Sequence, residues 1–487
     1  MTVTGARSTD HFPNTENPHL EFFKSCLRRH GTVNPTEAVL EWIQQRNSQT
    51  QVDIKEVPLD RISRWLTEPQ TGNLRHETGK FFTVEGIRIK TNAGLVKSWS
   101  QPIIHQPEIG YLGFLVKQID GVYHFLVQAK IEPGNVNHVQ LSPTVQATRS
   151  NFTGVHQGKR PAYIEYFRER RGRVLLDQLQ SEQGARFFRK RNRNIILEVN
   201  DDVPVTEDFK WLTLGQLKEL LRQDNVVNMD TRTVISGISY GNYSGESIDL
   251  LQVFSPSLMT GYGQDVYYSY IDNTRSLHPF SDILSWLTEL KSVYELEVTL
   301  IPLNNVDNWQ RDDYRIFHRD AKYFEVIGVD VNISSREVAK WSQPIVRPCQ
   351  EGIVAFISMK INGALHFLVQ AKLEVGNMDI VELAPTVQCI TGNYRLGQSE
   401  YEVPFLDYVL NARPDQIKYD VLLSEEGGRF YRNQNRNMVL LADSDFSEQL
   451  PSNFKWMTLN QIMRFMEYNN YLNIEARSLL SVLAWSH

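Results

Sequence analysis

Long hydrophobic runs, paired cysteines and an excess of basic residues are all missing from this chain of 487 residues. No segment approaches the roughly 20 apolar residues of a membrane-spanning helix, and the start of the chain lacks the apolar core of a signal peptide. The three cysteines, an odd number without CxxC spacing, argue against a disulfide framework or a zinc site. A net charge of −6 argues against a general nucleic-acid binder. We therefore expect a cytoplasmic protein with no membrane and no nucleic-acid partner.

Signature motifs of several enzyme classes are missing as well. The sequence has no GxxxxGK[ST], no GxGxxG opening a βαβ unit, no HExxH and no GxSxG. The segment SEEGGRF places Glu425 beside Glu426, but it lacks the helix-spaced glutamates that a magnesium-dependent diphosphate hydrolase needs. Metal, nicotinamide and serine chemistry therefore have no sequence signature here.

What the sequence does contain is a long internal repeat. HFLVQAKIE at 124–132 recurs as HFLVQAKLE at 366–374, and WSQPI at 99–103 recurs in the same register at 341–345. SEQGARFFRKRNRN, which begins at Ser181, likewise returns as SEEGGRFYRNQNRN from Ser424. A period this long indicates duplication of a whole domain. We assign 1–225 to a first repeat, 226–270 to a connector rich in Gly, Ser and Tyr, and 271–487 to a second repeat.

Local patterns predict the main elements of each repeat. A proline followed by helical apolar spacing predicts helices in PTEAVLEWIQQRNS (35–48) and PFSDILSWLTELKS (279–292). Two alternating runs around Asp120-Gly121, and around Asn362-Gly363 in the second repeat, predict β-hairpins. Thr213 and Thr458 are typical N-caps of later helices. We expect an α+β fold with a mostly antiparallel sheet and helices at both ends.

The repeated strand has two chemically different faces. With a period of two, Phe125, Val127, Ala129 and Ile131 point one way, and His124, Leu126, Gln128, Lys130 and Glu132 point the other. The polar face is either solvated or the wall of a pocket. Recurrence of the same order as His366, Gln370, Lys372 and Glu374 favours a pocket, as does Gly134, where a glycine turn lets backbone approach a ligand.

Two further groups of residues are open to alternative interpretations. Trp99 and Trp341, each before Gln-Pro, are either core residues or platforms for stacking a flat base or sugar. The RKRNRN block is either a solvated charge run or a cradle for a diphosphate, because a guanidinium fork matches phosphate oxygens. Its cations are Arg189, Lys190, Arg191 and Arg193, with Arg432 and Arg436 as counterparts.

The run WSQPIIHQPEIGYLGFLVKQIDGVYHFLVQAKIEPGNVNHVQLSPTVQATRSNF, followed by VHQG, YIEYF and SEQGARFFRKRNRN, closely resembles the NDP-hexose 2,3-dehydratases of antibiotic deoxysugar pathways. This resemblance implies two tandem Nudix-hydrolase-like domains without the Nudix metal box, a homodimer, a dTDP-sugar substrate and no cofactor or metal. The second repeat departs from it with Arg347-Pro348-Cys349 in place of His105-Gln106-Pro107, and with Glu382 in place of Gln140. We therefore expect a catalytic first repeat and a degenerate or auxiliary nucleotide site in the second.

The implied reaction is that of a carbon–oxygen lyase. It removes the C2 hydroxyl of dTDP-4-keto-6-deoxy-D-glucose by H3 abstraction and β-elimination, giving a 3,4-diketo-2,6-dideoxy sugar that passes to a 3-ketoreductase. An epimerase or isomerase acting on the same 4-keto sugar and a non-catalytic nucleotide-binding module are the alternatives.

Such a site needs a base, an acid and an oxyanion donor. Glu132 or His124 is the candidate base, Lys130 the candidate stabiliser of the O4 enolate, and Tyr163 or Tyr166 the candidate acid. The expected catalytic set is Lys130, Glu132, His124, Gln128, Tyr163 and Tyr166. The expected substrate-binding set is Trp99, Gln146, Arg149, Asn151, Arg189, Arg193 and Asn194. The expected second-site set is Trp341, Gln370, Lys372, Glu374, Gln388, Arg432 and Arg436.

Overall fold

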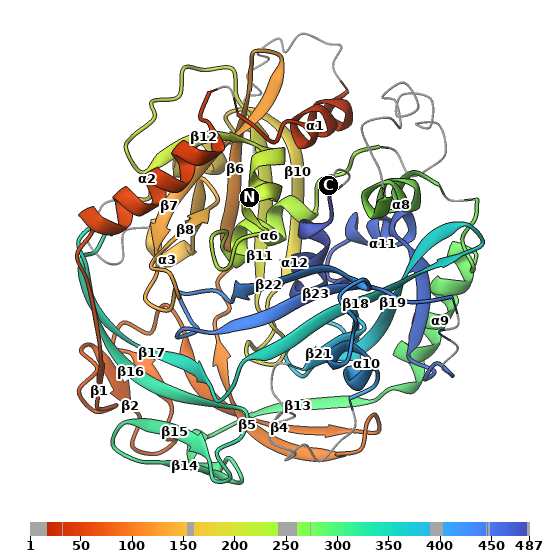
Figure 1. Ribbon diagram of the computed structural model, residues 1–487. Helices are drawn as coiled ribbons and strands as arrows, with labels where there is room; N and C mark the ends of the chain where they lie inside the picture. The colour runs from red at the N-terminus through yellow and green to blue at the C-terminus, as the bar shows by residue number, and fades with distance from the viewer. Residues whose placement is uncertain are drawn as a thin grey trace, which may run out of the picture.

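The computed structural model describes residues 17–31, 33–152, 160–241, 261–272, 274–389, 403–444, 446 and 449–484. The VHQG motif at 155–158 and positions 242–260 of the expected connector lie outside these residues. In Figure 1 the first repeat runs from red to yellow-green and the second from green to blue. No helix within the described ranges is both long and apolar enough to cross a bilayer.

Five helices recur in the same order in the two repeats. The helices of the first repeat are α1 (Pro18–Leu27), α2 (Thr36–Gln49), α3 (Arg149–Phe152), α4 (Ile164–Glu169), α5 (Leu214–Leu220) and α6 (Met229–Ser236). Those that follow are α8 (Gly261–Ile271), α9 (Phe280–Val293), the 3₁₀ helix η2 (Leu303–Asn305), α10 (Leu406–Leu410), α11 (Leu459–Met466) and α12 (Ile474–Val482). Helices α1, α2, α4, α5 and α6 of the first repeat recur in the second as α8, α9, α10, α11 and α12. The expected helices are confirmed as α2, α9, α5 and α11. Thr213 and Thr458 cap α5 and α11, each in a reciprocal capping box with a glutamine three residues later.

The strands also repeat in order. The first repeat contains β1 (Val52–Val57), β2 (Trp65–Thr67), β3 (Leu74–His76), β4 (Thr83–Thr91), β5 (Ser98–His105), β6 (Gly110–Ile119), β7 (Val122–Ile131), β8 (Val139–Ser142), β9 (Val145–Ala147), β10 (Arg173–Ser181), β11 (Arg191–Glu198) and β12 (Phe209–Thr213). The second contains β13 (Leu296–Ile301), β14 (Trp309–Arg311), β15 (Arg315–His318), β16 (Phe324–Ile333), β17 (Lys340–Pro348), β18 (Gly352–Ile361), β19 (Ala364–Leu373), β20 (Val381–Ala384), β21 (Val387–Cys389), β22 (Ile417–Ser424), β23 (Gln434–Leu441) and β24 (Phe454–Thr458).

Each repeat contributes one seven-stranded sheet, ordered β10-β11-β6-β7-β12 in the first repeat and β22-β23-β18-β19-β24 in the second, with two short strands added to each. Most pairings are antiparallel, but β11 with β6 and β23 with β18 are parallel. The hairpins β6–β7 and β18–β19 turn through the expected Asp-Gly and Asn-Gly pairs, and both residues of each pair have positive φ. The fold is thus α+β with two repeated halves, as the sequence predicts.

The two smaller sheets are built by strand exchange between the repeats. Strand β1 of the first repeat pairs with β16 of the second, and β13 of the second pairs with β4 of the first. In the lower part of Figure 1, the orange strands of the first repeat accordingly lie among the green and teal strands of the second. The repeats are interlocked rather than joined end to end.

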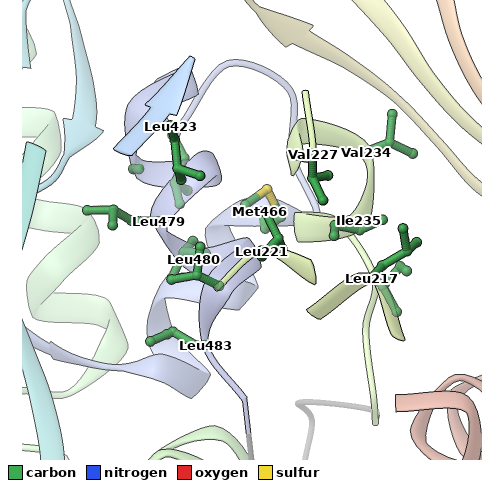
Figure 2. Packing of buried hydrophobic residues seen from close by; sticks show 14 of the residues in the cluster. Leu217, Leu221, Val227, Val234, Ile235, Leu423, Met466, Leu479, Leu480 and Leu483 are labelled. Atoms are coloured by element: carbon green, nitrogen blue, oxygen red, sulfur yellow. The ribbon is translucent and has the colours of Figure 1, made fainter. Parts of the chain in front are cut away.

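The helices α6 and α12 pack against each other at the centre of the molecule. Figure 2 shows Val234 and Ile235 of α6 on one side and Leu479 and Leu480 of α12 on the other, with Leu221 and Met466 between them, within a cluster of buried residues drawn from both repeats. Helix α6 lies within the stretch that the sequence assigns to the connector, but it follows β12 and α5 as α12 follows β24 and α11, and it is therefore counted here with the first repeat. Its central packing stabilises the contact between the repeats by removing apolar surface from water.

Strand β7 is covered on both faces. Phe125 and Val127 belong to the large shared core, as expected, while Leu126 on the opposite face packs in a second cluster with Phe167 and Trp211. The face that the sequence suggests to be an open polar wall is therefore apolar and buried at its centre. Its carboxyl end, at Lys130 and Glu132, lines a cavity.

Candidate active site

A cavity of about 680 Å³ lies where the first repeat's β7 faces the second repeat. This volume is in the range typical of small-molecule sites. The first repeat contributes Lys130, Glu132, Lys190 and Asp230 to its wall. The second contributes Arg336, Trp341, Glu426 and Arg429. The site is therefore composed by both repeats.

Lys130 and Glu132 form the floor of the cavity together with Gln146. Lys130 Nζ donates to the backbone carbonyl of Gln146 at 3.1 Å and lies 4.0 Å from Glu132 Oε1. Gln146 Nε2 donates to the same Glu132 oxygen at 3.0 Å. Burial lowers the pKa of Lys130, and the nearby Arg336 guanidinium lowers it further, whereas Glu132 opposes the shift. The floor thus places the Lys130 amine beside the Glu132 carboxyl group, which a neighbouring amide orients.

The opposite wall comes mainly from the second copy of the SE-G-RF motif. Arg429 donates through Nε to Gln106 Oε1 at 3.2 Å, and its guanidinium lies 4.2 Å from the ring centroid of Phe82. Burial raises the pKa of Glu426 to about 7, with Arg429 opposing the shift. Burial lowers the pKa of Lys190, in the first repeat, to about 8. Both groups therefore titrate near neutral pH, the range in which a side chain exchanges protons most effectively.

Asp230 adds a further buried acid. It occupies the first turn of α6, where the Asn228 side chain caps the helix and also donates to Gln146 Oε1 at 3.2 Å. Burial raises the pKa of Asp230 well above its ordinary value, and the carboxylates of Glu426, Glu182 and Glu132 add to the shift. Four carboxyl groups thus share one electrostatic environment with two lysines and Arg429, and they cannot all be ionised together at low cost.

The glycine turn after β7 has a different role from the expected one. The Gly134 N–H donates to the Gly427 carbonyl at 2.7 Å, and a side chain at Gly134 would overlap the carbonyl oxygen of Phe430. The close backbone approach is therefore to the second repeat and not to a ligand. Glu132 and Pro133 nevertheless line the cavity beside it.

Four residues of the expected catalytic set lie away from the cavity wall. His124 is buried near the start of β7, where its Nδ1 lies 2.9 Å from the Val122 carbonyl. Gln128 is half-buried where β7 pairs with β8 and β12. Tyr163 donates to the Pro204 carbonyl and stacks edge-on against Phe209, and Tyr166 packs in the same cluster.

Among the expected substrate-binding residues, Gln146 and Asn151 line the cavity. The remaining polar members lie elsewhere: Arg193 forms a two-pronged ion pair with Asp177, Asn194 is buried against Thr233, Arg149 begins α3, and the guanidinium of Arg189 lies over Phe188. Of the expected diphosphate cradle, Arg189 and Arg193 are thus engaged in other contacts, whereas Lys190 lines the cavity.

Each of the two tryptophans lies at the site of the other repeat, contrary to the assignment made from the sequence. Trp341 of the second repeat lines the cavity that contains Lys130. Trp99 of the first repeat packs with Val375, the residue that follows Glu374. Strand exchange causes this arrangement, because β5 and β17 belong to the two sheets that mix strands of both repeats.

The expected second-site residues form a partial copy of the floor. Lys372 Nζ donates to the Gln388 carbonyl at 3.3 Å, and Gln388 Nε2 donates to Glu374 Oε1 at 2.9 Å. Gln370 donates to the Pro385 carbonyl instead, and Arg436 forms an ion pair with Asp420. Arg432 lies over the ring of Tyr431. The lysine, glutamate and glutamine geometry is thus duplicated, whereas the expected Arg432 and Arg436 are engaged in other contacts.

The cavity wall also contains four residues outside the sets expected from the sequence: Asp230, Glu426, Arg429 and Arg336. The available signal was the difference between SEQGARF and SEEGGRF, where one repeat carries a carboxylate and the other an amide. Their meeting with Lys130 depends on how the repeats pack. No cluster of three or more His, Cys, Asp or Glu side chains suited to a metal ion occurs among the described residues.

Comparison with known proteins agrees with this architecture. The profile of the NDP-hexose 2,3-dehydratase family matches twice, at residues 36–238 and 280–483. Three relatives are each named dTDP-4-dehydro-6-deoxy-alpha-D-glucopyranose 2,3-dehydratase. The protein of Saccharopolyspora spinosa is 47% identical, over 97% of this chain and 96% of its own. That of Streptomyces violaceoruber is 44% identical, over 92% of this chain and 97% of its own. That of Amycolatopsis orientalis is 41% identical, over 99% and 96%. The chain belongs to the NDP-hexose 2,3-dehydratase family.

Proposed function

We propose that this protein is a lyase that removes the C2 hydroxyl of dTDP-4-keto-6-deoxy-D-glucose. The observation that carries the proposal is the set of three full-length relatives at 41–47% identity, all named for this reaction. The cavity supports it with a lysine and a glutamate side by side in a buried site of suitable size. The product is a dTDP-3,4-diketo-2,6-dideoxy sugar.

The chemistry follows from the C4 ketone, which makes H3 acidic. Glu132 takes this proton, and the electron pair of the C3–H bond forms an enolate with its charge on O4. Lys130, when protonated, donates to O4, and Gln146 keeps the Glu132 carboxylate in place through its 3.0 Å hydrogen bond. Collapse of the enolate expels the C2 hydroxyl. Electrostatic stabilisation of such an oxyanion typically contributes a factor of about 10² to 10³ in rate.

In this proposal the first repeat carries catalysis and the second provides an auxiliary nucleotide site. The copied floor of Lys372, Glu374 and Gln388 supports a retained binding function. We also assign each repeat to the Nudix-like class, in support of which each contains a seven-stranded mixed sheet flanked by helices. The assembly is a homodimer, a point that sedimentation velocity of the full chain tests.

The nature of the product suggests a downstream partner. A 1,2-diketone is electrophilic and labile, so a 3-ketoreductase is expected to consume it promptly. Adding such a reductase and its nicotinamide cofactor to the reaction should convert the product to a stable 3-hydroxy sugar nucleotide.

Incubation of the protein with dTDP-4-keto-6-deoxy-D-glucose, followed by mass spectrometry, tests the proposed function. Loss of one water from the sugar nucleotide, with and without chelator, is the expected result. Deuterium exchange at C3 with retention of the C2 oxygen would instead indicate an epimerase or isomerase. Binding of dTDP without turnover would indicate a non-catalytic module.

A further inference from the structure

The proposed mechanism leaves the departing hydroxyl without an acid, because Tyr163 and Tyr166 lie away from the cavity. Comparison of the two copies of one motif identifies a candidate for this acid. SEQGARFFRKRNRN and SEEGGRFYRNQNRN share their framework: Glu182 and Glu425 each accept a hydrogen bond from an asparagine ten residues later, at 2.6 Å in the first copy. The copies differ at a few positions around this framework, and three of those differences concern the cavity.

At each of these three positions, one of the two copies places its residue in the wall of the cavity. Glu426, Gly428 and Lys190 line it, whereas their counterparts in the other copy are Gln183, Ala185 and Asn433. The copies thus differ in the charge of one acid, the charge of one base and the presence of one methyl group. The two other differences between the copies, Phe188 against Tyr431 and Arg191 against Gln434, lie at residues that do not line the cavity.

Gly428 lacks the methyl group that Ala185 carries in the other copy, and this leaves space between two carboxyl groups. A Cβ atom built on Gly428 would lie 3.0 Å from Glu426 Oε1 and 3.4 Å from Glu132 Oε1. The two carboxyl groups, one from each repeat, therefore flank a single point of the backbone. Two carboxyl groups facing one reacting carbon framework, one as base and one as acid, are the arrangement that eliminations require.

The surroundings of Glu426 suit it to carry a proton. Burial raises its pKa to about 7, and the carboxylates of Glu182 and Glu132 add to the shift, while Arg429 and Lys190 oppose it. Asp230, on α6, belongs to the same group of interacting acids. Burial and the neighbouring carboxylates therefore favour the protonated form of Glu426.

We propose that Glu426, supplied by the second repeat, is the catalytic acid that protonates the departing C2 hydroxyl, and that Lys190 is a positioning residue that sets its charge. This inference rests on the proposed dehydratase function. It gives the second repeat a direct part in catalysis at the first repeat's Lys130–Glu132 floor.

The proton balance closes over one turnover. Glu132 takes H3, and the C2–O bond breaks as the Glu426 carboxyl proton joins the oxygen and water leaves. The resulting enol has a C2=C3 double bond and a hydroxyl on C3. Glu132 then returns a proton to C2 while the Glu426 carboxylate accepts the O3 proton, which gives the 3,4-diketone. Both side chains finish in their starting states, and no oxidant or reductant is needed.

Glu426→Gln tests the assignment, because the first copy of the motif already holds glutamine at this position. We expect kcat to fall by about 10² to 10⁴ with little change in KM, in line with the usual contribution of a general acid. The variant should still exchange H3 with deuterated solvent, since Glu132 is intact. A substrate with fluorine in place of the C2 hydroxyl should be affected far less, because fluoride leaves without full protonation. The matched control, Gln183→Glu, should keep normal turnover.

Three outcomes would overturn the inference: unchanged kcat in Glu426→Gln, an equal loss with the hydroxyl and fluoro substrates, or loss of H3 exchange. If the wild-type protein itself fails to release water, the proposed function fails instead, so the two results are distinguishable.

Lys190→Asn, which places the second repeat's residue in the first repeat, provides a second test. Removing this cation raises the pKa of Glu426, so the high-pH limb of the kcat profile should move to higher pH. An unmoved limb, or one at lower pH, would contradict the role of Lys190.

Discussion

The backbone N–H of Gly134 donates to the carbonyl of Gly427 at 2.7 Å, and this bond joins the end of the Lys130–Glu132 strand to the loop that carries Glu426. The relationship is reciprocal, because Gly376 N–H donates to the Gly184 carbonyl at the same distance. Each repeat therefore fixes the other's motif by main-chain contact. The relative position of the two carboxyl groups in the cavity is set by backbone and not by side-chain rotamers alone.

Gly134→Ala should destabilise the protein. Its new methyl group would overlap the backbone carbonyl of Phe430, which cannot rotate away as a side chain would. Overpacking of this kind costs at least about 2 kcal/mol. Urea unfolding monitored by tryptophan fluorescence measures the loss, and Gly376→Ala should behave alike because Phe187 occupies the equivalent place. Two variants with wild-type stability would show that the repeats do not pack as described.

Gly428→Ala should impair catalysis while leaving stability nearly unchanged. The methyl group would enter the space between Glu426 and Glu132, where the closest atom at 3.0 Å is the mobile end of a side chain. We expect kcat to fall at least about tenfold, since misplaced reacting groups lose rate steeply. Ala185→Gly, at the corresponding position of the other repeat, is the control and should retain activity. Equal activity of the two variants would remove the evidence that this space holds substrate.

Glu426→Gln should make the protein relatively more stable at alkaline pH. The pKa of Glu426 is about 7 in the folded state and near 4.5 as a free side chain, so the folded state binds more protons between these values. Stability contributed by this proton is present below about pH 4.5 and is lost as the pH rises through 7. The free energy of unfolding of the variant, minus that of the wild type, should therefore increase between pH 5 and pH 8. An increase near 1 kcal/mol or more is expected, since one unit of pKa shift is worth about 1.4 kcal/mol. A difference that stays flat with pH would argue that Glu426 is ionised throughout.

Arg232→Met should weaken the contact between the repeats. The buried guanidinium donates to the carbonyls of Ser424 at 2.6 Å and Val227 at 2.7 Å, and to Ser478 Oγ at 2.8 Å. Each buried acceptor left without a donor costs about 1 to 3 kcal/mol. Denaturant titration should show a loss of about 3 kcal/mol. Because Ser424 precedes Glu425 and Glu426, turnover should fall as well; a fully active variant of normal stability would contradict this role.

Local sequence patterns were sufficient for the elements that depend on neighbours in the chain. The Asp120-Gly121 turn and the caps at Thr213 and Thr458 could be predicted because their geometry requires only adjacent residues. The duplication was equally visible, since two copies of a strand must keep the same order of residues. Helices α1 and α8 were not predicted, although both pack against the sheets in equivalent ways.

The composition of the cavity could not be predicted in the same way. Strand β1 pairs with β16 across most of the chain length, and no periodicity in the sequence records such a partner. Trp341 and Glu426 reach Lys130 only through this interlocking. Residue type alone can also suggest a site that does not form. Arg193 is of a type suited to binding phosphate, yet it pairs with Asp177 on the neighbouring strand.

A comparison of Lys130→Ala with Lys372→Ala, and of Glu132→Gln with Glu374→Gln, is the most direct measurement of which floor is catalytic. All four variants are assayed for water loss from dTDP-4-keto-6-deoxy-D-glucose at saturating substrate, with circular dichroism to confirm folding. The Lys130 and Glu132 variants should lose at least about a hundredfold in kcat, and the Lys372 and Glu374 variants should lose much less. Near-normal turnover in both first-repeat variants would contradict the assignment of catalysis to the Lys130–Glu132 floor.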